Sequence, residues 1–150
     1  MKKIFFLCFM LSGLFSCKKE DVSPDYAPNF VGSYKGAVND YAANKRIYAY
    51  QLFVSSTVKN VLEMTLVSNV TLYEPSGSLI GTVSISIPVK SANVNDGSNF
   101  NIGENVTETQ QAPYKQTKYY LTGRGRLSGN LISAELTSQG TTRTLTLVKN

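Results

Sequence analysis

The side chains best suited to acid–base catalysis in this chain are five glutamates: Glu63, Glu74, Glu104, Glu108 and Glu135. A pair of carboxylates can hydrolyse a glycosidic bond, one as the acid and the other as nucleophile or base. None of the five lies in a local acidic motif, and isolated glutamates on strands usually face solvent. The chain also contains no histidine, the usual acid–base group near neutral pH. The sequence therefore favours a protein that is not an enzyme and uses no cofactor. A carboxylate-dependent hydrolase is a remote alternative.

Two arginines could instead bind an anion. Arg124 and Arg126 lie two residues apart, which places both side chains on one face of an extended strand. A guanidinium pair of this kind suits a carboxylate or a phosphate group. The opposite face of the same strand is apolar, however, which is typical of a strand with one buried and one wet face. We therefore expect the arginine face to be ordinary solvent-exposed surface.

The loop at residues 91–105 is the one place where a metal site could be suspected. It is rich in asparagine and contains Asp96, and calcium prefers such oxygen ligands. The loop fails the EF-hand pattern, because the positions of the first and third ligands hold Ala92 and Val94. Asn-Asp-Gly is also an ordinary turn sequence. We predict no metal site.

The first 16 residues have the anatomy of an export signal. Lys2 and Lys3 form a basic start and residues 4–15 form a mostly apolar run, too short to remain as a membrane-spanning helix. Residues 14–17, Leu-Phe-Ser-Cys, resemble the lipobox of bacterial lipoproteins, in which the cysteine is acylated and becomes the mature N-terminus. By this resemblance Cys17 is the lipid attachment site, and the protein is anchored in the outer membrane. The acidic and basic residues at 18–21 resemble the tether of Bacteroidota lipoproteins. Whether the protein faces the periplasm or the cell surface stays open.

Composition limits the other partners. The formal charge of the whole chain is +5, and two of the lysines fall in the leader. So mild an excess, with no dense basic patch, does not predict nucleic-acid binding. Residues 17–28 contain the lipidated cysteine, charged residues and two prolines, and we interpret them as a flexible tether. A single domain is expected over residues 29–150.

The rest of the chain is predicted to be all-β. Apolar and polar residues alternate with period two between clusters of Gly, Asn, Ser and Pro, and no segment has a sustained helical stripe. The candidate strands are 30–38, 46–56, 60–67, 69–75, 78–89, 99–109, 115–127, 130–138 and 141–149. Short turns between successive strands favour an antiparallel meander of about eight strands. Such a sheet loses its exposed edges by closing into a barrel. A two-sheet sandwich is the alternative.

The beginning of this domain resembles the first strand of lipocalin-like (calycin-like) barrels. In that family a Gly-x-Trp packs beneath the barrel and is capped by an Arg or Lys from the last strand. Here Gly32-Ser33-Tyr34 would take its place, with Arg143 as the capping cation over the Tyr34 ring. The later stretch, with Ile87-Pro88 and the glycine-rich hairpin at residues 123–130, resembles small Bacteroidota envelope lipoproteins with such barrels. The resemblance implies a fold and a location, and no activity.

Three tyrosines are the candidate ligand-binding residues: Tyr48, Tyr50 and Tyr119. Aromatic faces suit a sugar or lipid pocket, although tyrosine is also a common strand residue. We expect a non-enzymatic binding module for a small apolar or amphipathic ligand held in the mouth of the barrel. The alternative is a structural or accessory surface lipoprotein with a filled barrel, acting through envelope protein partners. Inward-facing Gly123 and Gly125 favour a cavity, while the many Leu, Ile and Val residues favour filling.

Overall fold

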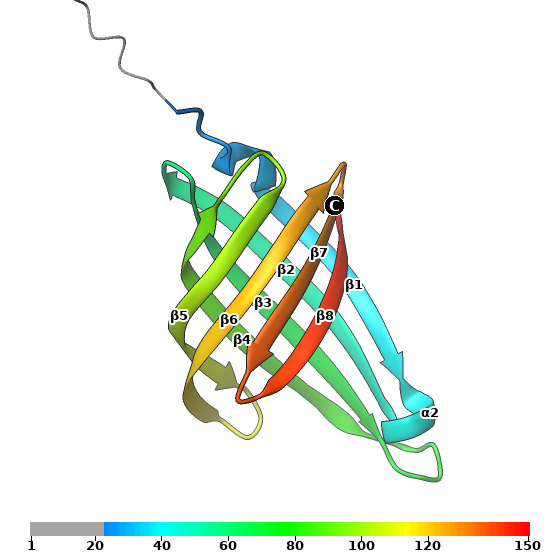
Figure 1. Cartoon of the computed structure of the whole chain (residues 1–150). Coiled ribbons are helices and arrows are strands. Elements are labelled where there is room, and N and C mark those ends of the chain that lie inside the picture. The colour runs from blue at the N-terminus through cyan, green and yellow to red at the C-terminus, as the bar shows by residue number, and fades with distance from the viewer. Residues whose placement is uncertain (1–22) are drawn as a thin grey trace, which may run out of the picture.

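Residues 23–150, described by a computed structural model, form one closed barrel. Each strand pairs antiparallel with its neighbour in sequence, and β8 returns to pair with β1 (Figure 1). The strands are β1 (Gly32–Asp40), β2 (Arg46–Val58), β3 (Val61–Tyr73), β4 (Leu79–Val94), β5 (Asn99–Gln110), β6 (Lys115–Ser128), β7 (Leu131–Ser138) and β8 (Thr141–Lys149). The predicted all-β meander, closed as a barrel of eight strands, is confirmed. The sandwich alternative is wrong.

One predicted boundary inside the sheet is also wrong. Residues 60–67 and 69–75 were expected to be separate strands, but they form the single strand β3. Ser68, taken as a break, continues the inward-facing series of this strand, between the buried Leu66 and Val70. A serine interrupts the apolar pattern without preventing an extended backbone, so alternation alone placed a false boundary here.

Two inward-facing glycines on β6 make room for side chains and leave little empty space. A Cβ atom at Gly125 would overlap the far end of the Phe100 ring, closest to its Cζ atom. A Cβ at Gly123 would lie 2.7 Å from Leu136 Cδ2. The space that the glycines free is therefore taken up by a phenylalanine and a leucine. The expectation that these glycines enlarge a cavity is wrong.

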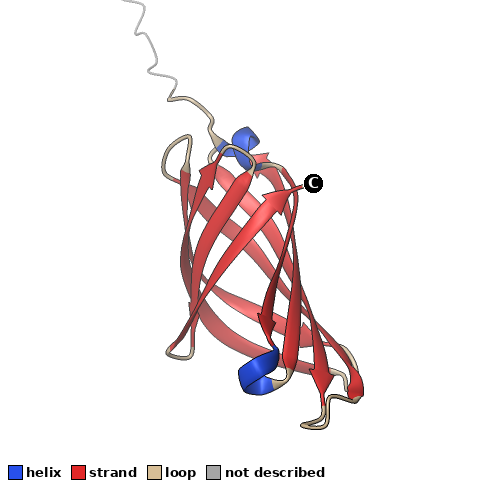
Figure 2. Cartoon of the chain, turned by 90° about the vertical axis from the view of Figure 1, so that its right-hand side faces the viewer, coloured by secondary structure: helices blue, strands red, loops and turns tan. Residues whose placement is uncertain are grey.

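A short 3-10 helix, η1 (Ala27–Phe30), closes one end of the barrel (Figure 2). Phe30 is fully buried, and the edge of its ring meets Phe100 at right angles with 5.7 Å between the ring centroids. The Tyr34 hydroxyl donates a hydrogen bond of 2.8 Å to the carbonyl oxygen of Phe30. Burial raises the pKa of Tyr34, because the phenolate would lose its water there. The chain thus seals this end with its own residues.

The turn between β2 and β3 holds the segment before η1 in place. Asn60 has a positive φ of 55°, and its side-chain oxygen accepts a hydrogen bond of 2.7 Å from the backbone N–H of Tyr26. The Asn60 amide nitrogen donates to the carbonyl of Pro24, and its backbone N–H donates to the Asp25 carboxylate. Residues from Pro24 onward are therefore hydrogen-bonded to the barrel, several residues before the expected domain start at Asn29. Residues 24–28 of the expected tether belong to the fold.

A cation from the last strand does lie over the Tyr34 ring, as predicted, but it is not the predicted residue. The cation over the Tyr34 ring is Lys149, whose Nζ lies 5.7 Å from the ring centroid. The register explains this, since Tyr34 is paired directly with Lys149 where β1 meets β8. Arg143 lies six residues earlier on the strand, about 20 Å along it at the rise of an extended chain. The pairing of Tyr34 with Arg143 is therefore wrong, and Arg143 belongs to the opposite end of the barrel.

That opposite end is not covered by a helix like η1. It carries the short helix α2 (Tyr41–Asn44) and the turns that join β3 to β4, β5 to β6 and β7 to β8 (Figure 1). The first described residues and the C-terminus both lie at the end closed by η1 (Figures 1 and 2). We call the two ends the closed end and the open end.

Candidate functional site

Polar side chains gather inside the barrel near its open end. We call this set the open-end cluster; its members are Tyr50, Ser68, Glu108, Tyr119 and Arg143. They come from β2, β3, β5, β6 and β8. Each occupies the inward face of its strand, because each shares the two-residue period of buried core residues on that strand. The cluster therefore lines the barrel interior at the end opposite to the one that η1 closes.

Tyr50 and Arg143 interact electrostatically within the open-end cluster. Burial raises the pKa of Tyr50, and the positive charge of Arg143 opposes that rise. The rings of Tyr50 and Tyr48 stack nearly parallel, at an interplanar angle of 5° and a centroid separation of 6.1 Å. Two of the predicted ligand-binding tyrosines, Tyr48 and Tyr50, are thus stacked on one another, with the Arg143 charge near Tyr50.

Tyr119, the third predicted tyrosine, is held by a carboxylate. Its hydroxyl donates a hydrogen bond of 2.9 Å to Glu108 Oε2. Burial and this bond to Glu108 both raise the pKa of Tyr119, while the charge of Arg143 partly counters the rise. The same arginine therefore influences both Tyr50 and Tyr119, which brings the β2 and β6 tyrosines to one site across the barrel.

Two polar groups in the open-end cluster lack the partners expected of buried or charged groups. The Ser68 side chain is 6% exposed, and its hydroxyl oxygen, beside Tyr50, has no hydrogen-bond partner of normal geometry among residues 23–150. Arg143 is exposed to solvent and forms no ion pair with a carboxylate in that part of the chain. Buried polar atoms are usually hydrogen-bonded, so an unpaired one calls for a specific explanation. A ligand that supplies the missing partners is such an explanation.

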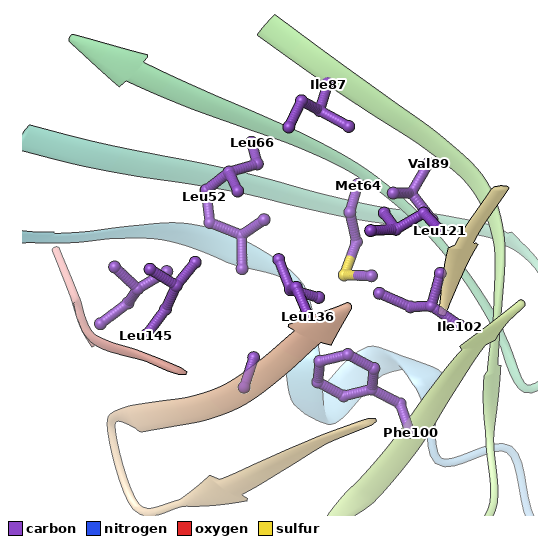
Figure 3. A pocket seen from close by; sticks show the side chains of 12 residues that line it. Leu52, Met64, Leu66, Ile87, Val89, Phe100, Ile102, Leu121, Leu136 and Leu145 are labelled. Carbon is purple, nitrogen blue, oxygen red and sulfur yellow. The ribbon is translucent and has the colours of Figure 1, made fainter. Parts of the chain in front are cut away.

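An apolar cavity lies inside the barrel, and Figure 3 shows the side chains that line it. Its volume is about 30 Å³, roughly enough for two water molecules. Moving two residues along each strand toward the closed end leads from Tyr50 to Leu52, from Ser68 to Leu66 and from Arg143 to Leu145. The leucines reached in this way all line the cavity. The barrel thus has a polar layer at its open end, followed by an apolar layer with a small vacant space.

Comparison with family models, with curated proteins and with solved structures finds no match to this chain. No helix in residues 23–150 is both long and apolar enough to cross a membrane. Cys17, the predicted lipid attachment site, lies outside the described residues.

Four of the five candidate catalytic glutamates make local contacts that do not form a catalytic pair. Glu135 pairs with Arg124 on the outer surface, with 2.7 Å between Arg124 Nη2 and Glu135 Oε2. Glu104 accepts hydrogen bonds from the backbone N–H of Lys90 and the Ser91 hydroxyl, at a bulge on β4. Glu63 and Glu74 accept hydrogen bonds from nearby hydroxyls in exposed positions. Glu108 is the one member of the five that faces the interior with the open-end cluster.

The two suspected ion sites are also explained by local structure. Arg124 is exposed and engaged by Glu135, as expected for a solvent-facing strand surface. Asp96 accepts hydrogen bonds from the backbone N–H groups of Ser98 and Asn99 and from the Asn99 side chain, which close a turn and lower the pKa of Asp96. The described residues hold no group of three or more His, Cys, Asp or Glu that could bind a metal ion.

Sequence reasoning identified the tyrosines but missed three members of the open-end cluster in this role. Arg143 was assigned to the closed end, although it shares its period with Leu145 and Leu147 and so had to face inward. Ser68 was treated as a strand break. Glu108 was considered only as a candidate catalytic group. The available signal was strand parity, since each residue lies an even number of positions from a core residue on the same strand.

Proposed function

We propose that this protein is a non-enzymatic lipoprotein of the bacterial cell envelope, anchored in the outer membrane through Cys17, whose barrel binds a small amphipathic ligand at its open end. The export signal and the resemblance to a lipobox support the anchor. The observation that carries the binding role is the layer of polar side chains at the open end, one step along the strands from an apolar cavity. A polar group and an apolar group on one ligand would match these two layers.

The polarity of the barrel agrees with this proposal. The first described residues lie at the closed end (Figure 1). An anchor attached to the segment that precedes them would hold the closed end nearer the membrane. The open end, with its cluster of polar groups, would then face away from that membrane. A ligand would reach the site from the aqueous side.

A second candidate function rests on the size of the cavity. Pockets for drug-sized ligands measure about 300–1,000 Å³, whereas the apolar cavity here measures about 30 Å³. A barrel so nearly filled by its own side chains would suit a structural or accessory lipoprotein that acts on envelope proteins through its outer surface. The two candidates differ in whether anything is bound inside the barrel.

Mass spectrometry of the protein purified from the outer membrane of its bacterial host tests both parts of the proposal. Under denaturing conditions we expect the mass of residues 17–150 plus fatty acyl groups on Cys17. Under native conditions we expect an additional mass that is lost on unfolding. A denatured mass that still includes residues 1–16 would rule out the anchor. Identical native and denatured masses would favour the filled barrel over the binding module.

A further inference from the structure

One part of strand β4 has a neighbour on one side only. Strand β5 ends at Gln110, which is paired with Ile85 of β4, so residues 79–83 of β4 extend past the end of β5 at the open end (Figure 1). On their other side these residues are paired with β3. We call residues 79–83 the free edge. We propose that the free edge binds an extended segment of a partner protein, which pairs with β4 as an added strand.

The backbone groups of Thr82 point to the unpaired side. The Ser84 carbonyl accepts a hydrogen bond of 2.8 Å from the Gln111 N–H, so the backbone groups of Ser84 face the β5 side. Residues two apart on a strand direct these groups to the same side, so those of Thr82 face it as well. Thr71, the β3 residue paired with Thr82, agrees with this, because the Tyr73 N–H, two residues further on, donates toward β2 and away from β4. Past the end of β5 no strand among residues 23–150 pairs with this side, and a second extended backbone is the partner that fits it.

The free edge lacks the features that usually keep sheet edges from pairing. Proteins protect such edges with charged side chains, prolines or bulges. No charged residue lies between Glu74 and Lys90, and the first proline after Leu79 is Pro88. The one register irregularity near the free edge lies beside Leu79, at the end of the strand. Leu79 and Ile80 are also 63% and 62% exposed, so they offer apolar contacts beside the backbone groups. The segment that fits is therefore extended, uncharged and apolar.

The tether of this chain is too short to be that segment. It joins the barrel at Pro24, which is bonded to Asn60, and Asn60 is bonded to Val94 at the closed end of β4. Thr82 lies about 40 Å from Val94 at the rise of an extended strand. The residues from Cys17 to Pro24 span at most about 25 Å. A chain cleaved before Cys17 therefore cannot reach its own free edge.

A second copy of the protein does not fit the proposed anchor. Antiparallel pairing of two identical edges requires a two-fold axis perpendicular to the sheet, and hence to the barrel axis. Such an axis would turn the closed ends of the two copies in opposite directions, together with their anchors. Two copies anchored in the same membrane cannot adopt that arrangement. The choice of a different protein as the occupant therefore rests on the proposed function, whereas the free edge itself does not.

Fluorescence polarisation of a labelled peptide tests this inference, with the mature protein in lipid nanodiscs and empty nanodiscs as the blank. The probe is a short peptide of alternating valine and threonine, N-methylated at every second residue. One of its edges can then pair with the protein, and the blocked edge keeps the peptide from aggregating. A peptide of the same sequence that is methylated at every residue is the control, because it has no N–H to donate. We expect the first peptide to bind and the second not to bind.

Variants of the free edge locate the binding. Thr82→Pro should abolish it, because proline removes the N–H that points to the unpaired side and places its ring there. Pairing with β3 should survive, since that N–H points away from β3. Ile80→Lys should weaken binding by about tenfold, because it removes an apolar contact and adds a charge to the edge. Val58→Lys at the closed end is the matched control, because Val58 is 59% exposed, and it should leave the affinity unchanged. Thermal unfolding near the wild-type temperature would show that each variant is folded.

The outcomes separate this inference from the proposed anchor. Failure of the first peptide to bind, equal binding of the two peptides, or unchanged binding to folded Thr82→Pro and Ile80→Lys would overturn strand addition at the free edge and leave the anchor standing. Native mass spectrometry of the mature protein in detergent tests the identity of the occupant. We expect a monomer. A dimer that Thr82→Pro separates would assign the free edge to a second copy and overturn the partner protein.

Discussion

Replacing Phe30 with alanine is expected to lower the free energy of unfolding by about 3–5 kcal/mol, the usual cost of removing a buried phenylalanine. Phe30 is 0% exposed and fills the closed end against the edge of Phe100. The helix η1 is only four residues long and has little stability of its own, so its position depends on this ring. Loss of the ring would also expose the Tyr34 hydroxyl that bonds to the Phe30 carbonyl.

Urea denaturation followed by circular dichroism measures this effect. Phe53→Ala is the matched control, because the Phe53 side chain lies on the outer face of β2 and is 46% exposed. We expect the control to change the unfolding free energy by less than about 1 kcal/mol, as for most surface substitutions. If Phe30→Ala were no more destabilising than Phe53→Ala, the Phe30 ring would not be part of the hydrophobic core.

Replacing Gly125 with alanine is expected to destabilise the barrel by about 1–3 kcal/mol, the range for forcing an extra group into a packed core. The added methyl group would occupy space held by the Phe100 ring. Phe100 is 1% exposed and packed against Phe30, so its ring cannot swing into solvent to relieve the overlap. Phe100 and the β6 backbone would have to move together.

A double-mutant cycle identifies the cause of this destabilisation. In a Phe100→Leu background, Gly125→Ala should cost clearly less than in the wild type, because the smaller side chain leaves room for the methyl group. Gly81→Ala serves as the control, since a Cβ at Gly81 would meet no atom within 4 Å. Thermal unfolding of the variants gives the comparison. Additive effects of the Gly125 and Phe100 substitutions would show that the two positions do not share the same space.

The part of the fold that depends on two-residue alternation could be predicted from the sequence. Strand β6 shows why, since its inward residues Leu121 and Gly125 are buried while Arg124 is exposed on the other face. The meander followed from short turns such as the one at Gly129, which has a positive φ of 60°. The break assigned at Ser68 failed because one polar residue can face the interior of a continuous strand.

The sites depend on register, which alternation does not supply. Whether Arg143 or Lys149 caps Tyr34 is decided by where β8 meets β1, a contact between residues more than 100 positions apart. Register also decides whether the space beside Gly125 is vacant or filled. Phe100 is paired with Gly125 across β5 and β6, and its ring fills that space. Strand parity could nevertheless have placed Arg143 inside the barrel, together with the tyrosines that were identified.

The most direct test of the open-end site is an NMR titration of the protein labelled at its Leu, Val and Ile methyl groups, with octanoate and octanol as probes. Binding at the open end should shift the methyl signals of Leu52, Leu66 and Leu145, which line the cavity next to the open-end cluster. The signals of Ile132, a buried residue that does not line the cavity, should move little. Shifts that spare all three leucines, or that appear only at exposed methyl groups such as those of Val58, would contradict a binding site inside the barrel.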